Sequence, residues 1–256
     1  MRIFQTNVID GASVVQTYST QDPGFPASNL RNPQRTQIWR TDDTVADEYA
    51  VFDLGSAQAV TGCAVFSHTL LSGDSAIRIQ AHTSNAWGAP SFSQTLTWSS
   101  GTIFAVFASQ SFRWWRFIFT KASAGVTRDI GRLWIGTYYA PTDVPDWEGV
   151  EARPDILDAK QRVPYGQTYG ERRATQRRFD ISFSAIPNAQ RVQFVTIADA
   201  VGEVTPFILQ IDENAGAGHE FAEPLYVILR EAPRFGVAGY DTEVKWDTKL
   251  MVDESL

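Results

Sequence analysis

Few side chains in this sequence have the types and spacing that catalysis requires. The three histidines are His68, His82 and His219, and His68 is close in sequence to the carboxylate of Asp74. Serines are common, so counting alone does not exclude a Ser-His-Asp triad, but no Gly-x-Ser-x-Gly turn is present to activate a serine. We therefore expect no catalytic residues and predict that the chain is not an enzyme.

Metal and phosphate ligands are equally sparse. The sequence has no His-x-x-x-His or Cys-x-x-Cys pair, and the glycine-rich segment Asn214–His219 lacks the Gly-Lys-Ser/Thr ending that binds phosphate. Oxygen ligands of the kind that calcium prefers are gathered in one acidic loop, although without the Asp-x-Asp-x-Asp-Gly spacing. The loop contains Asp42, Asp43, Asp47 and Glu48. No cofactor is expected, and a structural calcium ion in this loop is the open alternative.

A tryptophan in a polar loop is the sharpest candidate for ligand binding. Trp87 lies in the segment Thr83–Gly88, and Arg78 and His82 are nearby in sequence. Exposed aromatic rings stack on the C–H faces of sugars, while polar side chains bind the hydroxyl groups. Trp87, Arg78 and His82 are therefore predicted to bind carbohydrate, with a place in the core as the alternative for Trp87. Most of the tryptophans lie inside expected strands, and three are assigned to the core: Trp39, Trp115 and Trp134.

Basic side chains are concentrated at one place in the sequence. The cluster consists of Arg172, Arg173, Arg177 and Arg178, while the stretch Asp143–Asp158 is acidic. In a ring of identical subunits, the basic patch of one subunit can face the acidic patch of the next. We therefore predict that the arginine cluster is an oligomer interface, and an ordinary solvated surface is the alternative.

Composition narrows the classes of partner. The 256 residues are 43% hydrophobic and 20% charged, with a formal net charge of -7. This balance indicates a folded chain and disfavours nucleic acid as a partner. No apolar run approaches the roughly 18 to 20 residues that span a bilayer, so no membrane insertion is expected. The single cysteine, Cys63, lies in an apolar run and is predicted to be buried. Without a disulfide framework, folding in a reducing cytoplasm is expected.

Strands are the elements that must position these residues. Over the first 140 residues, short runs of β-formers are bounded by Gly, Ser, Asn, Asp or Pro, with no helical period between them. This pattern predicts an antiparallel β-sandwich. The expected strands are Glu48–Leu54, Ala59–Ser67, Ser75–His82, Ser91–Trp98, Ile103–Phe107, Arg113–Thr120 and Ile130–Thr137.

A second unit follows a proline-rich connector. The segment Tyr138–Tyr169 has four prolines and no period, which predicts an extended arm outside any packed element. Beyond it, Arg177–Ala185 alternates as a strand, and Pro187–Val201 carries Val192, Val195, Ala198 and Val201 at helical spacing. We predict a sandwich over residues 1–139, an arm over 140–169, and a small α+β domain with one helix over 170–256.

The order of short motifs in the first unit resembles that of a known family. Asn29-Leu30 precedes Trp39-Arg40-Thr41, then Asp53-Leu54-Gly55, the arginine-bearing strand Phe112–Phe119 and a closing strand that ends at Gly136. This order resembles the discoidin, or coagulation-factor type C, branch of the galactose-binding-like sandwiches, over roughly residues 26 to 139. Extracellular members of that family usually join their termini by a cysteine pair, which this chain lacks. The resemblance therefore implies a version that folds inside a cell or belongs to a virion.

This variant of the motifs is similar to modules in bacteriophage tail proteins. In the second unit, a strand, a helix and the segment Thr205–Leu209 follow in an order that resembles the belt-forming domains of siphophage distal-tail and minor tail proteins. The resemblance implies a structural virion protein near the distal end of a phage tail, at the tail tip or baseplate, folded in the bacterial cytoplasm. It would form a homo-oligomeric ring, a trimer or hexamer, against neighbouring tail tube or hub proteins.

Two other functions stay open. In the first, the sandwich is a carbohydrate-binding module of a receptor-binding or adhesion protein and holds a host-surface glycan on Trp87. In the second, the chain is a glycan hydrolase with paired carboxylates in its acidic loops, although no Asp/Glu pair is singled out by its context. Because one fold can host many functions, the fold does not decide between them.

Overall fold

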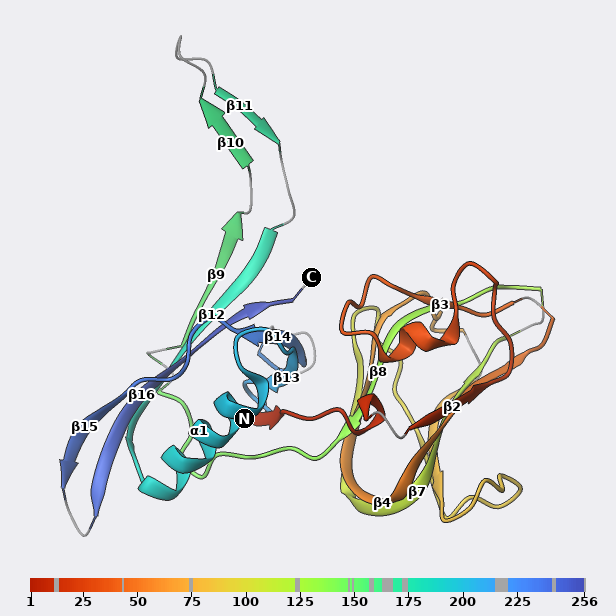
Figure 1. The fold of residues 1–256 in the computed structure, drawn as a ribbon, viewed down its shortest axis with the longest axis horizontal. Coiled ribbons are helices and arrows are strands. Elements are labelled where there is room, and N and C mark those ends of the chain that lie inside the picture. The colour runs from red at the N-terminus through yellow and green to blue at the C-terminus, as the bar shows by residue number, and fades with distance from the viewer. Residues whose placement is uncertain are drawn as a thin grey trace. The chain divides into compact units, whose positions relative to one another are not determined.

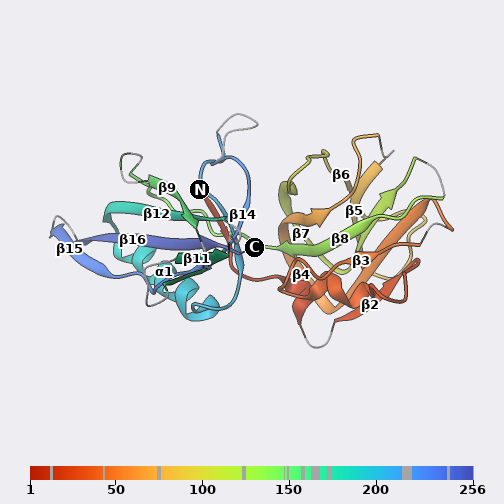
Figure 2. The same cartoon turned by 90° about the horizontal axis from the view of Figure 1, so that it is seen from above.

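The computed structural model describes residues 1–11, 14–42, 44–73, 76–122, 125–146, 148, 150–156, 159–162, 168–171, 175–214, 221–240 and 243–255. The chain divides into two compact units. One consists of Thr6–Tyr138, and the other combines Met1–Gln5 with Tyr139–Leu256. Both are built mainly from antiparallel strands, and one α-helix lies within the described residues (Figures 1 and 2). The predicted fold class, mainly β with one helix, is confirmed.

The first unit, which we call the sandwich unit, contains one continuous sheet of antiparallel strands. Its strand order is β3-β8-β4-β7-β5-β6, with β2 paired to β4. Two short 3-10 helices, Val8–Asp10 and Ala27–Arg31, precede the long strands. The strands are β2 (Val15–Tyr18), β3 (Trp39–Arg40), β4 (Asp47–His68), β5 (Ala76–His82), β6 (Phe92–Thr95), β7 (Ile103–Thr120) and β8 (Asp129–Gly136).

The long strands β4 and β7 differ from the sequence prediction, which divided each into two. The two halves of each strand have different neighbours: β4 pairs with β8 from Gly62 onward, while β7 pairs with β5 over its last residues. Pairing between β4 and β7 continues across a register shift that begins after Asp53, and Gly55 has a positive φ of 76° there. Glycine adopts this conformation without strain, so the strand continues where its composition suggested a turn.

The core of the sandwich unit contains the tryptophans and the cysteine that the sequence predicted to be buried. Trp39, Trp115 and Trp134 are buried, as predicted, and so is the thiol of Cys63. Burial raises the pKa of that thiol, which makes Cys63 an inert core residue. Close packing also requires Gly131, because a β-carbon at that position would collide with the carbonyl oxygen of Arg35.

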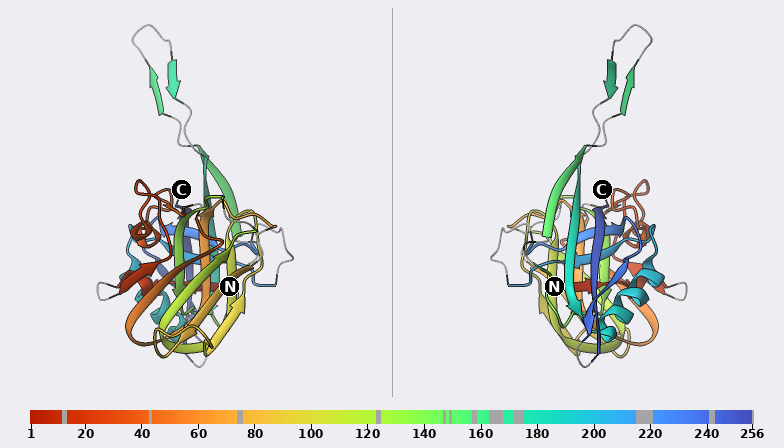
Figure 3. Two further views of the ribbon diagram at one scale, coloured as in Figure 1. Left: turned by 90° about the vertical axis from the view of Figure 1, so that its right-hand side faces the viewer. Right: turned by 90° about the vertical axis from the view of Figure 1, so that its left-hand side faces the viewer.

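The second unit, which we call the C-terminal unit, has a seven-stranded antiparallel sheet. Its order is β1-β13-β14-β16-β12-β9, with β15 paired to β16, and β10 and β11 form a separate pair. Figures 1 and 3 show this pair beyond the end of the β9–β12 ribbon. The strands are β1 (Arg2–Phe4), β9 (Val150–Ile156), β10 (Ala159–Arg162), β11 (Thr168–Glu171), β12 (Thr175–Ile186), β13 (Phe207–Gln210), β14 (Leu225–Leu229), β15 (Phe235–Tyr240) and β16 (Val244–Glu254).

The helix α1 (Asn188–Val201) forms where the sequence predicts it and ends at Gly202, whose φ is 55°. Its buried face is different from the predicted one. Phe194 and Ile197 are buried together with Val201, and the ring of Phe194 lies 5.0 Å from that of Phe183 on β12. Val192 is exposed, because the larger side chains of the neighbouring helix face bury more apolar surface against the sheet.

Two parts of the predicted domain division differ from the structure. The segment expected to be an unpacked arm contains β9, which pairs with β12 and places Pro154 opposite Arg177. Proline is tolerated there because β9 is the last strand of the sheet, where one side of the backbone needs no partner. The residues of β1, predicted as part of the sandwich, instead pair with β13 of the C-terminal unit. That pairing joins residues about 200 positions apart, which local patterns do not encode.

Candidate functional site

Strand β5 separates apolar from polar side chains on its two faces. Ile77, Ile79 and Ala81 are buried in the core, so Arg78, Gln80 and His82 project from the opposite face. Arg78 and His82 are half-buried, and Gln80 is buried. The sequence-predicted pair Arg78 and His82 therefore lies on one face of one strand, with Gln80 between its two members.

The neighbouring strand β7 adds side chains to the same face. In the antiparallel register, Arg116 lies opposite Gln80, and Trp114 lies opposite His82. The carbonyl oxygen Oε1 of Gln80 accepts hydrogen bonds from Nε of Arg116 at 3.1 Å and from Nη2 at 2.5 Å. The amide of Gln80 in turn donates to Oγ of Ser93 on β6 at 3.2 Å. A row of side chains across three strands thus fixes the position of the Arg116 guanidinium.

Trp87 lies in the segment between β5 and β6 and contacts this row. The guanidinium carbon of Arg116 is 4.5 Å from the centroid of the Trp87 ring, a cation–π contact. The indole Nε1 donates a hydrogen bond to Oδ1 of Asn85 at 2.6 Å. The centroid of the Tyr49 ring on β4 lies 6.0 Å from the same guanidinium carbon. Trp87 is half-buried, so the structure holds an accessible ring in a fixed orientation.

The charges on this face are unequally compensated. Burial lowers the pKa of Arg116, while Tyr49 and Asp47 act in the opposite direction. Asp53, also on this face, accepts hydrogen bonds from Nε and Nη2 of Arg113 at 2.6 and 2.7 Å. Those hydrogen bonds hold the pKa of Asp53 below its usual value, against the smaller effect of burial. Asp53 is therefore already neutralised by Arg113, whereas the neutral amide of Gln80 is the one hydrogen-bond partner of Arg116 among the described residues.

His82 is fixed by the segment that leads into β6. Its Nδ1 accepts a hydrogen bond from the backbone N–H of Ser91 at 3.3 Å and lies 2.6 Å from Oγ of the same residue. Because Nδ1 accepts, the other ring nitrogen, Nε2, carries the proton in the neutral imidazole. His82 can therefore donate a hydrogen bond from the edge of this face.

Five residues make up this candidate site, and the sequence predicted three of them as ligand-binding residues. Trp87, Arg78 and His82 were predicted, whereas Arg116 and Gln80 were not. Gln80 could have been predicted from the sequence, because alternate residues of a strand point to the same face and Gln80 lies between Arg78 and His82. Arg116 could not be assigned in the same way, since its place opposite Gln80 depends on the pairing of β5 with β7.

The predicted oligomer-interface arginines have partners within the chain where they are described. Arg177 binds the carboxylate of Glu254 through two nitrogens, at 2.8 and 2.9 Å. Arg178 forms an ion pair with Asp253 at 3.4 Å. Arg172 and Arg173 lie outside the described residues. The two described arginines thus connect β12 to β16 in the same sheet.

The acidic loop that suggested calcium contains a buried cation from the chain itself. The Nζ of Lys121 donates to Oε1 of Glu48 at 3.0 Å and to the carbonyl oxygen of Asp42 at 2.9 Å. Thr20 donates to Oε2 of Glu48 at 2.7 Å. Asp43 lies outside the described residues, and among those described no group of three His, Cys, Asp or Glu side chains is arranged to hold a metal ion.

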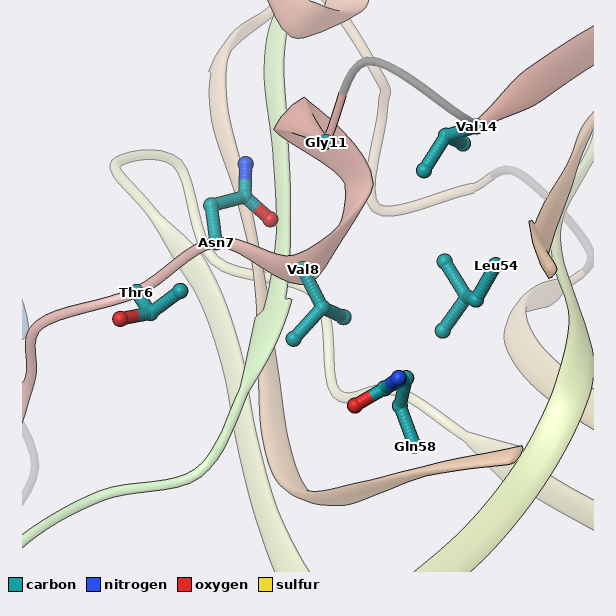
Figure 4. Close-up of a pocket in the computed structure, with 7 residues that line it drawn as sticks. All are labelled: Thr6, Asn7, Val8, Gly11, Val14, Leu54 and Gln58. Carbon is teal, nitrogen blue, oxygen red and sulfur yellow. The ribbon is translucent and has the colours of Figure 1, made fainter. Parts of the chain in front are cut away.

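The remaining chemical candidates do not form a reactive centre in the described part of the chain. Asp74 and His219 lie outside the described residues, and burial lowers the pKa of His68. Figure 4 shows a hollow of about 260 Å³ lined by Thr6, Asn7, Val8, Gly11, Val14, Leu54 and Gln58. The side-chain amide of Asn7 already has hydrogen-bond partners within the fold: it donates to the carbonyl of Leu133 and accepts from the N–H of Ile135. No helix among the described residues is long and apolar enough to cross a membrane.

Among known proteins, the matches to this chain come from solved structures. No family model and no curated protein matches it. The structure is similar to a chitosan-binding module from a Paenibacillus chitosanase/glucanase, with 21% identity, 52% of this chain and 99% of the module covered, and a TM-score of 0.41. A Streptococcus pneumoniae fucose binding module gives 14% identity, 52% and 99% coverage, and a TM-score of 0.43. The lectin binding domain of Lectinolysin, complexed with Lewis b, gives 9% identity, 51% and 95% coverage, and a TM-score of 0.42. Likenesses at this level establish neither a shared ligand nor a shared family.

Proposed function

We propose that the sandwich unit is a carbohydrate-binding module whose ligand contacts Trp87 on the face formed by β5 and β7. The observation that carries this proposal is the fixed indole: Arg116 lies over Trp87, and Gln80 holds Arg116. A ring that is already oriented loses little conformational freedom when a sugar stacks on it. Arg78 and His82 lie on the same face and can donate hydrogen bonds to hydroxyl groups. The proposed activity is binding, without a reaction.

The experiment that tests this proposal replaces the ring and keeps the fold. Trp87→Ala should reduce binding to a responsive glycan at least tenfold, because the stacking surface is lost. Trp98→Ala is the matched control, since Trp98 is also partly exposed but donates its indole N–H to the carbonyl of Leu70, which precedes β5. Binding is measured by calorimetry, and folding by thermal unfolding. Equal glycan affinity in the Trp87 variant and the wild type would refute the proposal.

A second candidate function is assembly, in the form that the sequence suggested: a structural component of a phage tail that forms a homo-oligomeric ring near its distal end. The observation that favours assembly is the pair β10–β11, which hydrogen-bonds only within itself among the described strands. A two-stranded ribbon is marginally stable alone in water, so a surface on another subunit would stabilise it. This candidate and the first are compatible, because the ribbon belongs to the C-terminal unit.

Light scattering on a sizing column tests the assembly candidate. The intact chain should have the mass of a discrete multimer, such as a trimer or hexamer. A variant in which residues 157–174 are replaced by a short glycine-containing turn should have the mass of a monomer, because β9 and β12 keep their pairing while the β10–β11 ribbon is lost. A monomeric intact chain at high concentration, or an unchanged multimer after the replacement, would contradict this candidate.

A further inference from the structure

Two arginines on the β5–β7 face differ from three other arginines of the sandwich unit. Elsewhere in the sandwich unit, Arg40, Arg113 and Arg132 each form an ion pair with an aspartate. Arg116 has hydrogen bonds to the neutral Gln80, and Arg78 has neither a hydrogen bond nor an ion pair to any described residue. The face therefore carries two guanidinium groups with no carboxylate partner among the described residues.

The strand register brings these two arginines close together. Gln80 lies opposite Arg116, and Arg78 is two positions before Gln80 on the same face of β5. Arg78 and Arg116 are thus diagonal neighbours on adjacent strands, about 7–8 Å apart along the sheet, within reach of long side chains. Two hydrogen-bond donors that converge from adjacent strands can bind one small anionic group from both sides.

The acidic side chains of this face do not neutralise the two arginines. Asp53 is held by Arg113 through two hydrogen bonds. Asp47 is exposed on β4, and β7 separates β4 from β5. Asp47 pairs with Thr120 of β7, two positions from Ile118, the residue that pairs with Arg78. Asp47 acts on the charge of Arg116 without forming an ion pair with it. Partial burial of Arg116 with no described carboxylate in contact costs free energy, which a bound anion would recover. This local positive charge occurs in a chain whose formal net charge is -7.

We propose that the ligand of this face is an acidic saccharide, whose carboxylate, sulfate or phosphate group binds between Arg78 and Arg116 while its sugar ring contacts Trp87. This inference rests on the proposed carbohydrate-binding function and adds the charge of the ligand to it. Nη1 of Arg116 makes no hydrogen bond to a described residue and supplies a donor toward the anion, since Nε and Nη2 are used by Gln80. The anion binds through charge-assisted hydrogen bonds, so its affinity falls as salt screens the charges.

The test uses pairs of probes that differ in charge. The acidic members are oligogalacturonate, sialyllactose, a chondroitin sulfate oligosaccharide and mannose 6-phosphate. Their uncharged counterparts are methyl-esterified oligogalacturonate, lactose, unsulfated chondroitin methyl ester and mannose, and a chitosan oligosaccharide supplies positive charge. Single-stranded DNA is included because its bases also stack on aromatic rings beside cations. The intact chain should bind at least one acidic saccharide tenfold more tightly than its counterpart, and should bind chitosan and DNA more weakly.

A variant of Arg78 then tests whether this preference depends on the charge of that arginine. Arg78→Gln should reduce affinity for the acidic probe about tenfold and affinity for its neutral counterpart much less, because glutamine keeps hydrogen-bond donors for hydroxyl groups but loses the positive charge. The fold should be kept, since Arg78 holds no described residue in place. Arg234→Gln is the matched control: Arg234 is an exposed arginine of the C-terminal unit. Equal binding of both members of every pair, with loss in Trp87→Ala, would refute the acidic ligand and keep the carbohydrate-binding function. No saccharide binding at all would refute both, and preferential DNA binding would replace the saccharide by a nucleic acid.

Discussion

The Nζ of Lys121 lies 3.0 Å from Oε1 of Glu48, and both side chains are fully buried. Glu48 is the second residue of β4, and Lys121 directly follows β7, so the pair joins the ends of two adjacent strands. Thr20 satisfies the other oxygen of the Glu48 carboxylate, and Lys121 also binds the backbone carbonyl of Asp42. A loop that resembles a cation site is thus closed by an ammonium group from the chain itself.

Removing that ammonium group should destabilise the sandwich unit strongly. Lys121→Met retains much of the side-chain volume but leaves the buried carboxylate of Glu48 without its counter-charge, so we expect the free energy of unfolding to fall by about 3–5 kcal/mol. Urea titration followed by tryptophan fluorescence measures the change. The double variant Lys121→Met, Glu48→Gln should recover part of the loss, because no buried charge remains. A loss as large in the double variant as in the single one would show that packing, and not charge, stabilises this site.

Calcium should leave the stability of this protein unchanged. An ion that bound the native acidic loop would raise the melting temperature through mass action. However, Lys121 already binds Oε1 of Glu48 and the backbone carbonyl oxygen of Asp42, and its positive charge repels a divalent cation. Differential scanning calorimetry with calcium, and with the chelator EGTA as control, should therefore give equal Tm values within error. A rise of several degrees that EGTA reverses would establish a calcium site and contradict this prediction.

The pairing of Asp53 with Arg113 should be visible as a pH-dependent stability. Its hydrogen bonds to Arg113 hold the pKa of Asp53 below its value in the unfolded chain. A depressed folded-state pKa contributes stability above the unfolded value of about 3.9, and this stability is lost as pH falls through the folded-state pKa. Arg113→Ala should therefore be less stable than the wild type at pH 7, and the difference should shrink toward pH 3. A difference that stays constant over this range would exclude the ion pair as its cause.

Individual strands could be predicted from the sequence, whereas the pairing between strands could not. Alternation predicts β5 and β12 because the period of two is a local property of each strand. It does not predict that β1 pairs with β13, or that Arg116 meets Gln80, since both contacts join residues far apart in the chain. Trp87 could be predicted as a candidate from its polar loop, whereas the arginine that orients it became visible only once the register was known.

Helix α1 should depend on one arginine for its contact with the β15–β16 hairpin. The guanidinium carbon of Arg191 lies 4.6 Å from the centroid of Trp246 and 5.3 Å from that of Phe235. Cation–π contacts to two rings contribute about 1–2 kcal/mol, so Arg191→Ala should lower the free energy of unfolding by that amount. Arg234→Ala is the control, because its exposed ion pair with Glu231 contributes little. Equal effects of the two substitutions would show that the ring contacts add no stability.

The orientation of Trp87 should depend on Arg116 more than on the rest of the sheet. Arg116→Met keeps the aliphatic stem but removes the guanidinium that lies 4.5 Å from the indole centroid and binds Gln80. The indole N–H signal of Trp87 in a nitrogen-15 correlation spectrum, assigned with Trp87→Phe, should shift and sharpen as the ring gains freedom. The indole signals of Trp39, Trp115 and Trp134 should stay in place, because these side chains are held in the core. Glycan affinity should fall together with the Trp87 signal change. An unaltered Trp87 signal, with affinity reduced all the same, would show that Arg116 binds the ligand directly and does not position the ring.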